Sequence, residues 1–305
     1  GVEVQAQLVT ATAELGVRAA PLASVPAGAK LRLAKPRIGV FDVFGGNMPT
    51  GWDQWVLREF EFPYELVFGD RIQRGDLRRD YDVLLFHTGL PAGRDLSQLG
   101  QGRDAETLQK LAAALPKFED WSTLQGRATR LEGDATWKAL RAFVEQGGTL
   151  LALGSECQKV ARAFELPVEV GTFVADAAAE GGRRATRREE FYIPGSLVAL
   201  TLDPRDPLAA GCVRQPAAMF TNTTPVLSVT GPGATVVARY RRHDTLVSGW
   251  AIGEEYIAEK AAVVAAEVGK GRVVMFGADV TYRGQPVGTF KLLFAAIRAA
   301  ATARE

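Results

Sequence analysis

The run TLLALGSECQKVARAF, residues 149–164, decides the fold. Residues 149–155 form a continuous apolar stretch, which is typical of a strand at the centre of a parallel sheet covered on both faces. The residues after it, from Glu156, carry polar and apolar positions at helical spacing. A buried strand that passes directly into a helix is the unit from which doubly wound α/β domains are built.

Towards the amino terminus the same pattern recurs. RIGVFDV (37–43) and YDVLLFHTG (81–89) are predicted as buried strands, YELVFG (64–69) as a further strand, and GWDQWVLREF (51–60) as an amphipathic helix. Strands that alternate with helices through short loops predict an α/β fold with a doubly wound, mostly parallel sheet.

Towards the carboxyl terminus the pattern changes. About residues 171–277 are β-rich, with turn signals at GPG (231–233) and GKG (269–271), and predict antiparallel or edge strands. A final helix is expected over about 286–300. We therefore expect residues 1–35 to be an amino-terminal helix and linker belonging to an upstream region, and residues 36–300 to be the α/β domain.

Composition excludes several classes of function. Lys and Arg total 36 against 35 Asp and Glu, so no global field draws in nucleic acid, and no nucleic-acid partner is expected. Two cysteines cannot make a disulfide-stapled scaffold, and no apolar run predicts a membrane span. The compartment stays open: secreted or periplasmic if a signal peptide was removed, otherwise cytoplasmic.

Several runs carry a family resemblance, and the clearest are FYIPGS (191–196), SGWAIGEEY (248–256), GKGRVVMFG (269–277) and NMPTGWDQWVLREFEFPY (47–64). They resemble the carboxyl-terminal region of large bacterial proteins of the zinc carboxypeptidase-like peptidase family. That region is similar to class I glutamine amidotransferase domains, which have a flavodoxin-like three-layer fold.

The resemblance implies a peptidase accessory domain. Its partner would be the upstream peptidase domain of the same polypeptide, and zinc is expected only there. The sequence leaves open whether the chain forms a homo-oligomer.

Zinc peptidase chemistry is not expected within this chain. A carboxypeptidase of this kind takes its ligands from an HxxE motif and a distant histidine. The chain has two histidines; Leu90 stands three residues after His87, and Leu246 three residues after His243. Neither histidine begins the motif, so no metal site and no cofactor are predicted here.

Amidotransferase chemistry is not expected either. It needs a thiolate on a sharp turn between strand and helix, and the G-x-C-x-G pattern of that family would lie on residues 154–158. Glu156 then takes the place of the nucleophile, and Cys157 comes one residue late. The usual histidine after the penultimate strand is missing from GADVTYRG (277–284). The triad is therefore degenerate, and no catalytic residue is expected.

Some alternatives remain. Cys157 opens the helix after one central strand and His87 ends another, so a hydrolase or amidotransferase could use this pair. Ser155 could imitate a hydrolase nucleophile, or it could cap the helix. Glu156 could complement the helix dipole, or it could face the crevice at the ends of the strands as a ligand contact.

The loop GGNMPTGWDQW (45–55) is a further candidate, because two glycines after a strand precede a pair of tryptophans. One interpretation is a flexible loop whose tryptophans pack over the sheet. The other is that the loop lines the crevice, with Asn47 and Trp52 contacting a ligand. In that case the domain would be a carbohydrate or peptide binding module.

Overall fold

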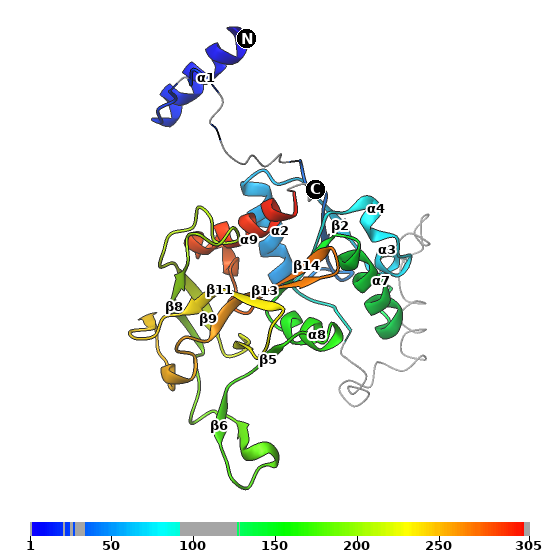
Figure 1. The fold of residues 1–305 in the computed structure, drawn as a ribbon, viewed down its shortest axis with the longest axis vertical. Helices are drawn as coiled ribbons and strands as arrows, with labels where there is room; N and C mark the ends of the chain where they lie inside the picture. Colours follow the sequence, from blue (N-terminus) through cyan, green and yellow to red (C-terminus); the bar gives the residue numbers. More distant parts are fainter. Residues whose placement is uncertain are drawn as a thin grey trace. The chain divides into compact units, whose positions relative to one another are not determined.

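A computed structural model of the chain describes residues 2–20, 22–24, 27, 34–91, 127 and 129–301. The chain divides into two compact units, Gly1–Arg32 and Leu33–Glu305. The first unit contains the helix α1 (Val2–Leu15), whose described side chains are mostly exposed. The second unit contains the sheet and all the other described helices (Figure 1).

One half of the sheet is parallel. Its order is β2 (Tyr64–Val67), β1 (Ile38–Phe41), β3 (Val83–Phe86), β4 (Thr149–Leu153) and β14 (Gly271–Phe276), each parallel to its neighbours. This is the 2-1-3-4-5 arrangement of flavodoxin-like sheets, in which the order reverses between the first and third strands. The doubly wound α/β fold that the sequence predicts is confirmed.

The other half is antiparallel and joins the first through β14. Beyond β14 the order is β13 (Ala261–Val268), β11 (Ala234–Tyr240), β8 (Gly195–Leu202) and β12 (Leu246–Ser248). Branches and connections complete this half: β5 (Val168–Val170), β9 (Ala217–Thr221), β10 (Leu227–Val229) and the 3-10 turn η2 (Glu254–Tyr256). The pair β6 (Phe173–Ala175) and β7 (Arg183–Ala185) forms a separate ribbon around the turn η1 (Glu180–Gly182).

The predicted turns lie where they were expected in this half. Residues 231–233 stand between β10 and β11, and residues 269–270 join β13 to β14 as a hairpin. The antiparallel part that the sequence predicts is thereby confirmed.

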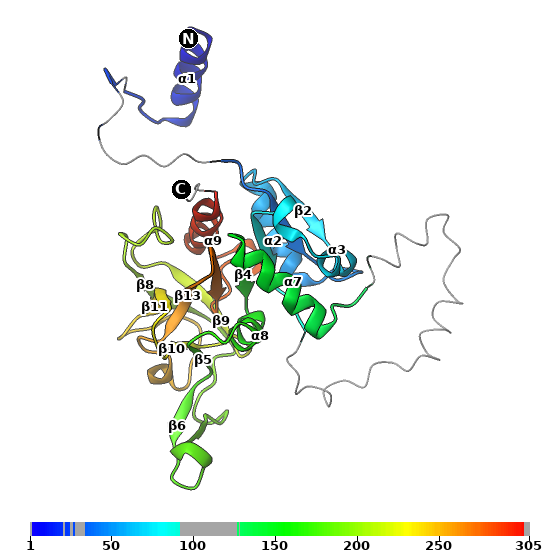
Figure 2. The same cartoon turned by 45° about the vertical axis from the view of Figure 1, so that its right-hand side comes forward.

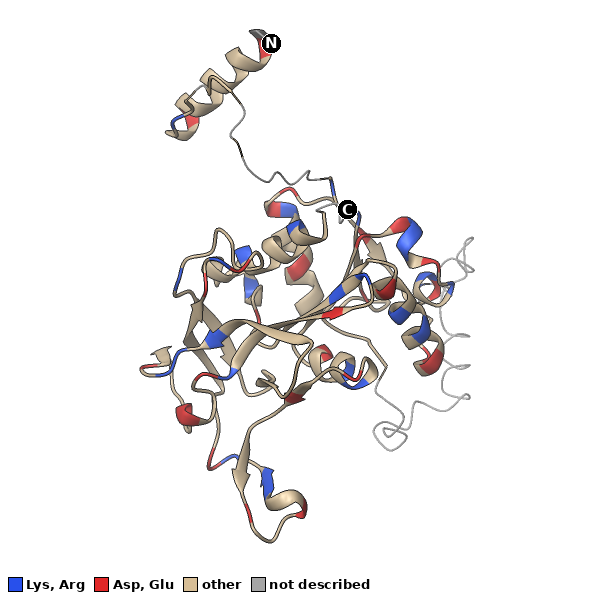
Figure 3. Cartoon of the chain, viewed as in Figure 1, with Lys and Arg blue, Asp and Glu red and all other residues tan. Residues whose placement is uncertain are grey.

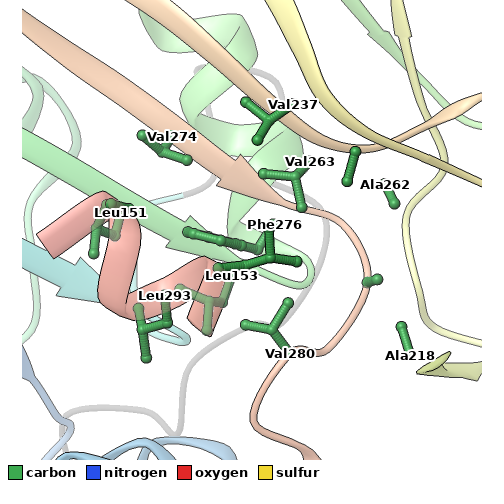
Figure 4. Packing of buried hydrophobic residues seen from close by; sticks show 14 of the residues in the cluster. Leu151, Leu153, Ala218, Val237, Ala262, Val263, Val274, Phe276, Val280 and Leu293 are labelled. Atoms are coloured by element: carbon green, nitrogen blue, oxygen red, sulfur yellow. The ribbon is translucent and has the colours of Figure 1, made fainter. Parts of the chain in front are cut away.

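Helices cover both faces of the parallel half. One apolar cluster joins Leu57 of α2 (Met48–Glu59) and Leu293 of α9 (Val287–Ala300) to Val40, Leu85 and Leu151 of the sheet. Figure 4 shows this packing around Leu151, Leu153, Phe276 and Leu293. The cluster extends into the antiparallel half, because Leu200 and Val237 belong to it.

The alternate positions of the same strands face the other way. There Leu84, Phe86 and Leu150 pack with Phe143 of α7 (Gly133–Glu145) and Val160 of α8 (Glu156–Ala163). Two short helices, α3 (Gly69–Gln73) and α4 (Leu77–Asp80), complete this layer. Burial on both faces explains why residues 150–153 are apolar throughout.

Charged side chains are mixed along the chain. Figure 3 shows Lys and Arg interspersed with Asp and Glu over the helices and loops. Among the described residues, no helix combines the length and the hydropathy needed to cross a membrane.

Candidate functional site

The candidate site lies where the order of the parallel strands reverses. Asp42 follows β1 and His87 follows β3, the two strands that flank the reversal. Ligands of open α/β sheets bind beside the carboxyl ends of the strands at such a point. The carboxyl ends of β4 and β14 bring Gly154 and Asp279 to the same edge of the sheet.

The centre of the site is a buried pair formed by His87 and Asp53. Asp53 is on α2 and has no exposed surface, while His87 is 9% exposed. Nδ1 of His87 lies 2.9 Å from Oδ2 of Asp53. A carboxylate accepts hydrogen bonds, so Nδ1 carries the proton and Nε2 is directed away from Asp53.

Thr281 completes the network from the loop after β14. Its hydroxyl donates to Oδ1 of Asp53 at 2.6 Å, and the Thr281 backbone N–H donates to Oδ1 of Asp279 at 3.1 Å. The network therefore links α2, β3 and the loop that leads to the turn η3 (Tyr282–Gly284).

The carboxylates around His87 favour its charged form. Burial lowers the pKa of His87, but the negative charges of Asp53, Asp279 and Glu156 outweigh this effect, and the net pKa is raised. The pKa of Asp279 is also raised, mainly by burial and partly by Asp53, although His87 opposes the change. His87 and Asp279 therefore keep their protons to a higher pH than the same side chains would in water.

The sharp turn between strand and helix lies at Gly154, two residues before Glu156. Gly154 follows β4 directly and has a φ of +56°, whereas Glu156 is already the first residue of α8. A Cβ built on Gly154 would lie 3.5 Å from Nε2 of His87. The residue that faces the histidine therefore carries no side chain.

Cys157 lies three positions beyond that turn and points into the core. It is 0% exposed, and its Sγ donates to the carbonyl oxygen of Ala152 at 3.3 Å. Burial, followed by the charge of Glu156, raises the pKa of the thiol. A buried, protonated thiol is a poor nucleophile, so being at the start of a helix does not activate Cys157.

Glu156 is also buried, at 1% exposure, and its carboxylate is fully engaged. Oε2 accepts from the backbone N–H of Leu90 at 2.9 Å, and Oε1 accepts from Nζ of Lys159 at 2.8 Å. Ser155 occupies the N-cap position of α8, but its hydroxyl makes no capping bond and lies 3.4 Å from Oε1 of Glu156. The expected cap is therefore wrong, because Ser155 has helical backbone angles.

Asn47 and Trp52 have structural partners. Oδ1 of Asn47 accepts from the backbone N–H of Thr50 at 3.1 Å and caps α2, while Nδ2 donates to Oδ1 of Asp42 at 2.7 Å. The Trp52 ring meets the Trp55 ring edge to face, with centroids 6.1 Å apart. Of the two interpretations of this loop, these contacts favour packing.

Sequence reasoning identified His87 but missed Asp53, Asp279 and Thr281. The signal for Asp53 was its place on the face of α2 that also carries the buried Val56 and Leu57. A carboxylate on a buried face requires a partner. No comparable signal marks Thr281, because its role depends on the path of a loop.

The described residues contain no group of three or more His, Cys, Asp or Glu side chains that is suited to a metal ion. The donors at the strand ends are instead tied to one another and to backbone groups. Their arrangement does not fit a zinc site.

The similarity of this chain to known proteins lies in its backbone fold. No family model matches the sequence, and no curated protein matches it. Similar solved structures include a GMP synthase component from Thermoplasma acidophilum, with 10% identity, 87% of this chain and 94% of that chain covered, and a TM-score of 0.47. A ThuA-like protein from Bacteroides uniformis has 9% identity, coverage of 91% and 95%, and a TM-score of 0.48.

A β-galactosidase from Rahnella sp. R3 is also similar, with 10% identity and a TM-score of 0.49. The alignment covers 90% of this chain but only 32% of the β-galactosidase. The carboxypeptidase parentage implied by the sequence resemblance stays a prediction.

Proposed function

We propose that this chain is a non-catalytic, amidotransferase-like accessory domain of a zinc carboxypeptidase-like protein, and that it positions or binds a ligand at the carboxyl edge of its sheet. The observation that carries the proposal is the turn after β4. Gly154 faces His87 there and has no side chain to act as a nucleophile.

The surroundings of the turn support the same conclusion. The nearby thiol, Cys157, is enclosed in the core, and Glu156 is held by Leu90 and Lys159. Acyl transfer requires a nucleophile within hydrogen-bond reach of its base. The described part of the site offers His87 and Asp53 as a base and its orienting group, without a protein nucleophile beside them.

The alternative is a hydrolase that uses Cys157 with His87. It would require the thiol to leave its bond to Ala152 and turn out of the core. Burial and the charge of Glu156 raise the pKa of the Cys157 thiol, and His87 does not counteract them. The geometry therefore favours the non-catalytic role.

Alkylation of the native protein tests this proposal. Cys212 is half-buried and serves as an internal control for the enclosed Cys157. With iodoacetamide near neutral pH, we expect mass spectrometry to find Cys212 modified well before Cys157, and Cys157 modified only on unfolding. Faster modification of Cys157 in the folded protein would show an activated thiol and overturn the proposal.

A further inference from the structure

The site around Gly154 combines a histidine with one unused nitrogen and two unused backbone donors. Nδ1 of His87 is bonded to Asp53, whereas Nε2 has no hydrogen-bond partner in the described part of the chain. Nε2 is also not among the fully enclosed polar atoms that lack a partner. Nε2 is therefore not fully enclosed.

The backbone supplies the second feature. Within the described residues, the N–H groups of Ser155 and Glu156 make no hydrogen bond, although the carbonyl of Gly154 accepts from the N–H of Cys157 at 3.1 Å. These N–H groups begin α8, where unsatisfied donors are expected and are commonly completed by a ligand or by water. His87, more than nine-tenths buried, lies beside them.

Gly154 supplies the space between the histidine and the helix. A side chain there would place its Cβ 3.5 Å from Nε2, which is ordinary contact distance for one atom. Apart from the neighbouring residues in the chain, the imidazole is the only described group within 4 Å of that position, so the other sides of the glycine are open.

The charges around this space select the kind of ligand. Three carboxylates act on His87: Asp53 from α2, Asp279 from the loop after β14, and Glu156 from α8. Lys159 pairs with Glu156 and offsets one of these three negative charges. The net negative charge that remains around His87 disfavours the binding of a carboxylate or a phosphate. A neutral hydroxyl group can accept a hydrogen bond from a backbone N–H. It can also donate a hydrogen bond to Nε2 of His87, or accept one from it.

We propose that the space over Gly154, between Nε2 of His87 and the backbone N–H groups that begin α8, binds a hydroxyl group of a neutral, polyol-like small molecule. The inference rests on the ligand-binding part of the proposed function and names the chemistry of its ligand.

Two histidines in the chain make nuclear magnetic resonance a direct test. His243 is exposed and serves as the internal reference. The histidine-labelled protein is titrated with glycerol, and separately with sodium acetate at matched ionic strength. We expect glycerol to shift the Nε2 signal of His87 saturably, at roughly millimolar to tens of millimolar concentration for so small a ligand, and to leave His243 unchanged.

Ser155→Pro is the matched variant. Ser155 has a φ of −60°, which proline adopts, so the change removes one donor while keeping the local conformation. We expect the glycerol shift to weaken at least several-fold, with the Nδ1 proton signal of the His87–Asp53 pair retained as evidence of folding. If that signal is lost, Gly154→Ala, which fills the space with a methyl group, replaces the proline variant.

Each other outcome overturns the inference: no shift at His87, an equal shift at His243, a shift with acetate in place of glycerol, or an unchanged shift in the folded variant. None of them bears on the alkylation of Cys157. Conversely, an activated Cys157 would overturn the non-catalytic role and leave the glycerol result standing.

Discussion

Asp53 determines what His87 can do. It is a fully buried carboxylate that receives one bond from the imidazole and one from the Thr281 hydroxyl. A buried charge is tolerated only when it is paired and hydrogen-bonded, so removing either partner exposes the other to the full cost of desolvation. The pair therefore contributes to stability as well as to the site.

This contribution depends on pH. The pKa of His87 in the folded protein is raised above its ordinary value of 6.5. Between that value and the folded pKa, the native state binds more protons than the unfolded state, so the free energy of unfolding falls as pH rises. The stabilisation is complete below the unfolded pKa and is lost as pH rises through the folded pKa.

Asp53→Asn is expected to reduce this dependence, because Asp53 is the strongest of the three carboxylates that raise the pKa of His87. At pH 6 the variant should be less stable by about 1.5–3 kcal/mol, the usual contribution of a hydrogen bond to a charged group, and the difference should shrink towards pH 9. Urea unfolding across this range measures it, with the exposed His243→Gln as a control that keeps the wild-type profile. If the free energy of unfolding changed with pH equally in Asp53→Asn and in the wild type, the pH dependence could not come from the His87–Asp53 pair.

At the scale of elements, the site depends on how α2 packs against the turn η3. Trp55 of α2 lies against Gly284, where a Cβ would come within 2.6 Å of the Trp55 ring. Gly284 also has a φ of +64°, in the region that favours glycine. Close packing here keeps Asp53 within reach of Thr281.

Gly284→Ala tests this packing, and Gly181→Ala is the matched control. Gly181 has a φ of +77° but no atom within 4 Å of a built Cβ, so its substitution measures the backbone cost alone, about 1–2 kcal/mol. Gly284→Ala should cost roughly 1–3 kcal/mol more, because it also overpacks. Equal changes in the unfolding midpoint would show that the contact with Trp55 contributes nothing.

The elements were largely predictable, whereas the site was not. Residues 150–153 and 83–86 are apolar because both faces of their strands are covered, and this pattern is local. The sequence placed the turn after residues 149–154, but it did not show that Gly154 would face His87, because that contact depends on how β3 and β4 lie side by side. Asp53 and Thr281 stand 228 positions apart, and only the fold brings them together.

At the scale of the molecule, two sheet halves share one core. The parallel half resembles a flavodoxin-like domain in strand order, and the antiparallel half continues it through the pairing of β13 with β14. Figure 2 shows the two halves on opposite sides of the domain, with β2 in one and β8 and β11 in the other. This arrangement brings loops from α2, β3, β4 and β14 to one edge. The chain thus has an Asp–His pair at that edge, and the residue of the neighbouring turn that faces the histidine is a glycine.

We propose that this arrangement does not perform amidotransferase or hydrolase chemistry through a protein thiol. Ammonia release from L-glutamine by the intact chain, measured beside Cys157→Ser, tests it most directly. We predict release no faster than the buffer blank for both proteins. Release by the wild type that is abolished in Cys157→Ser would contradict the account.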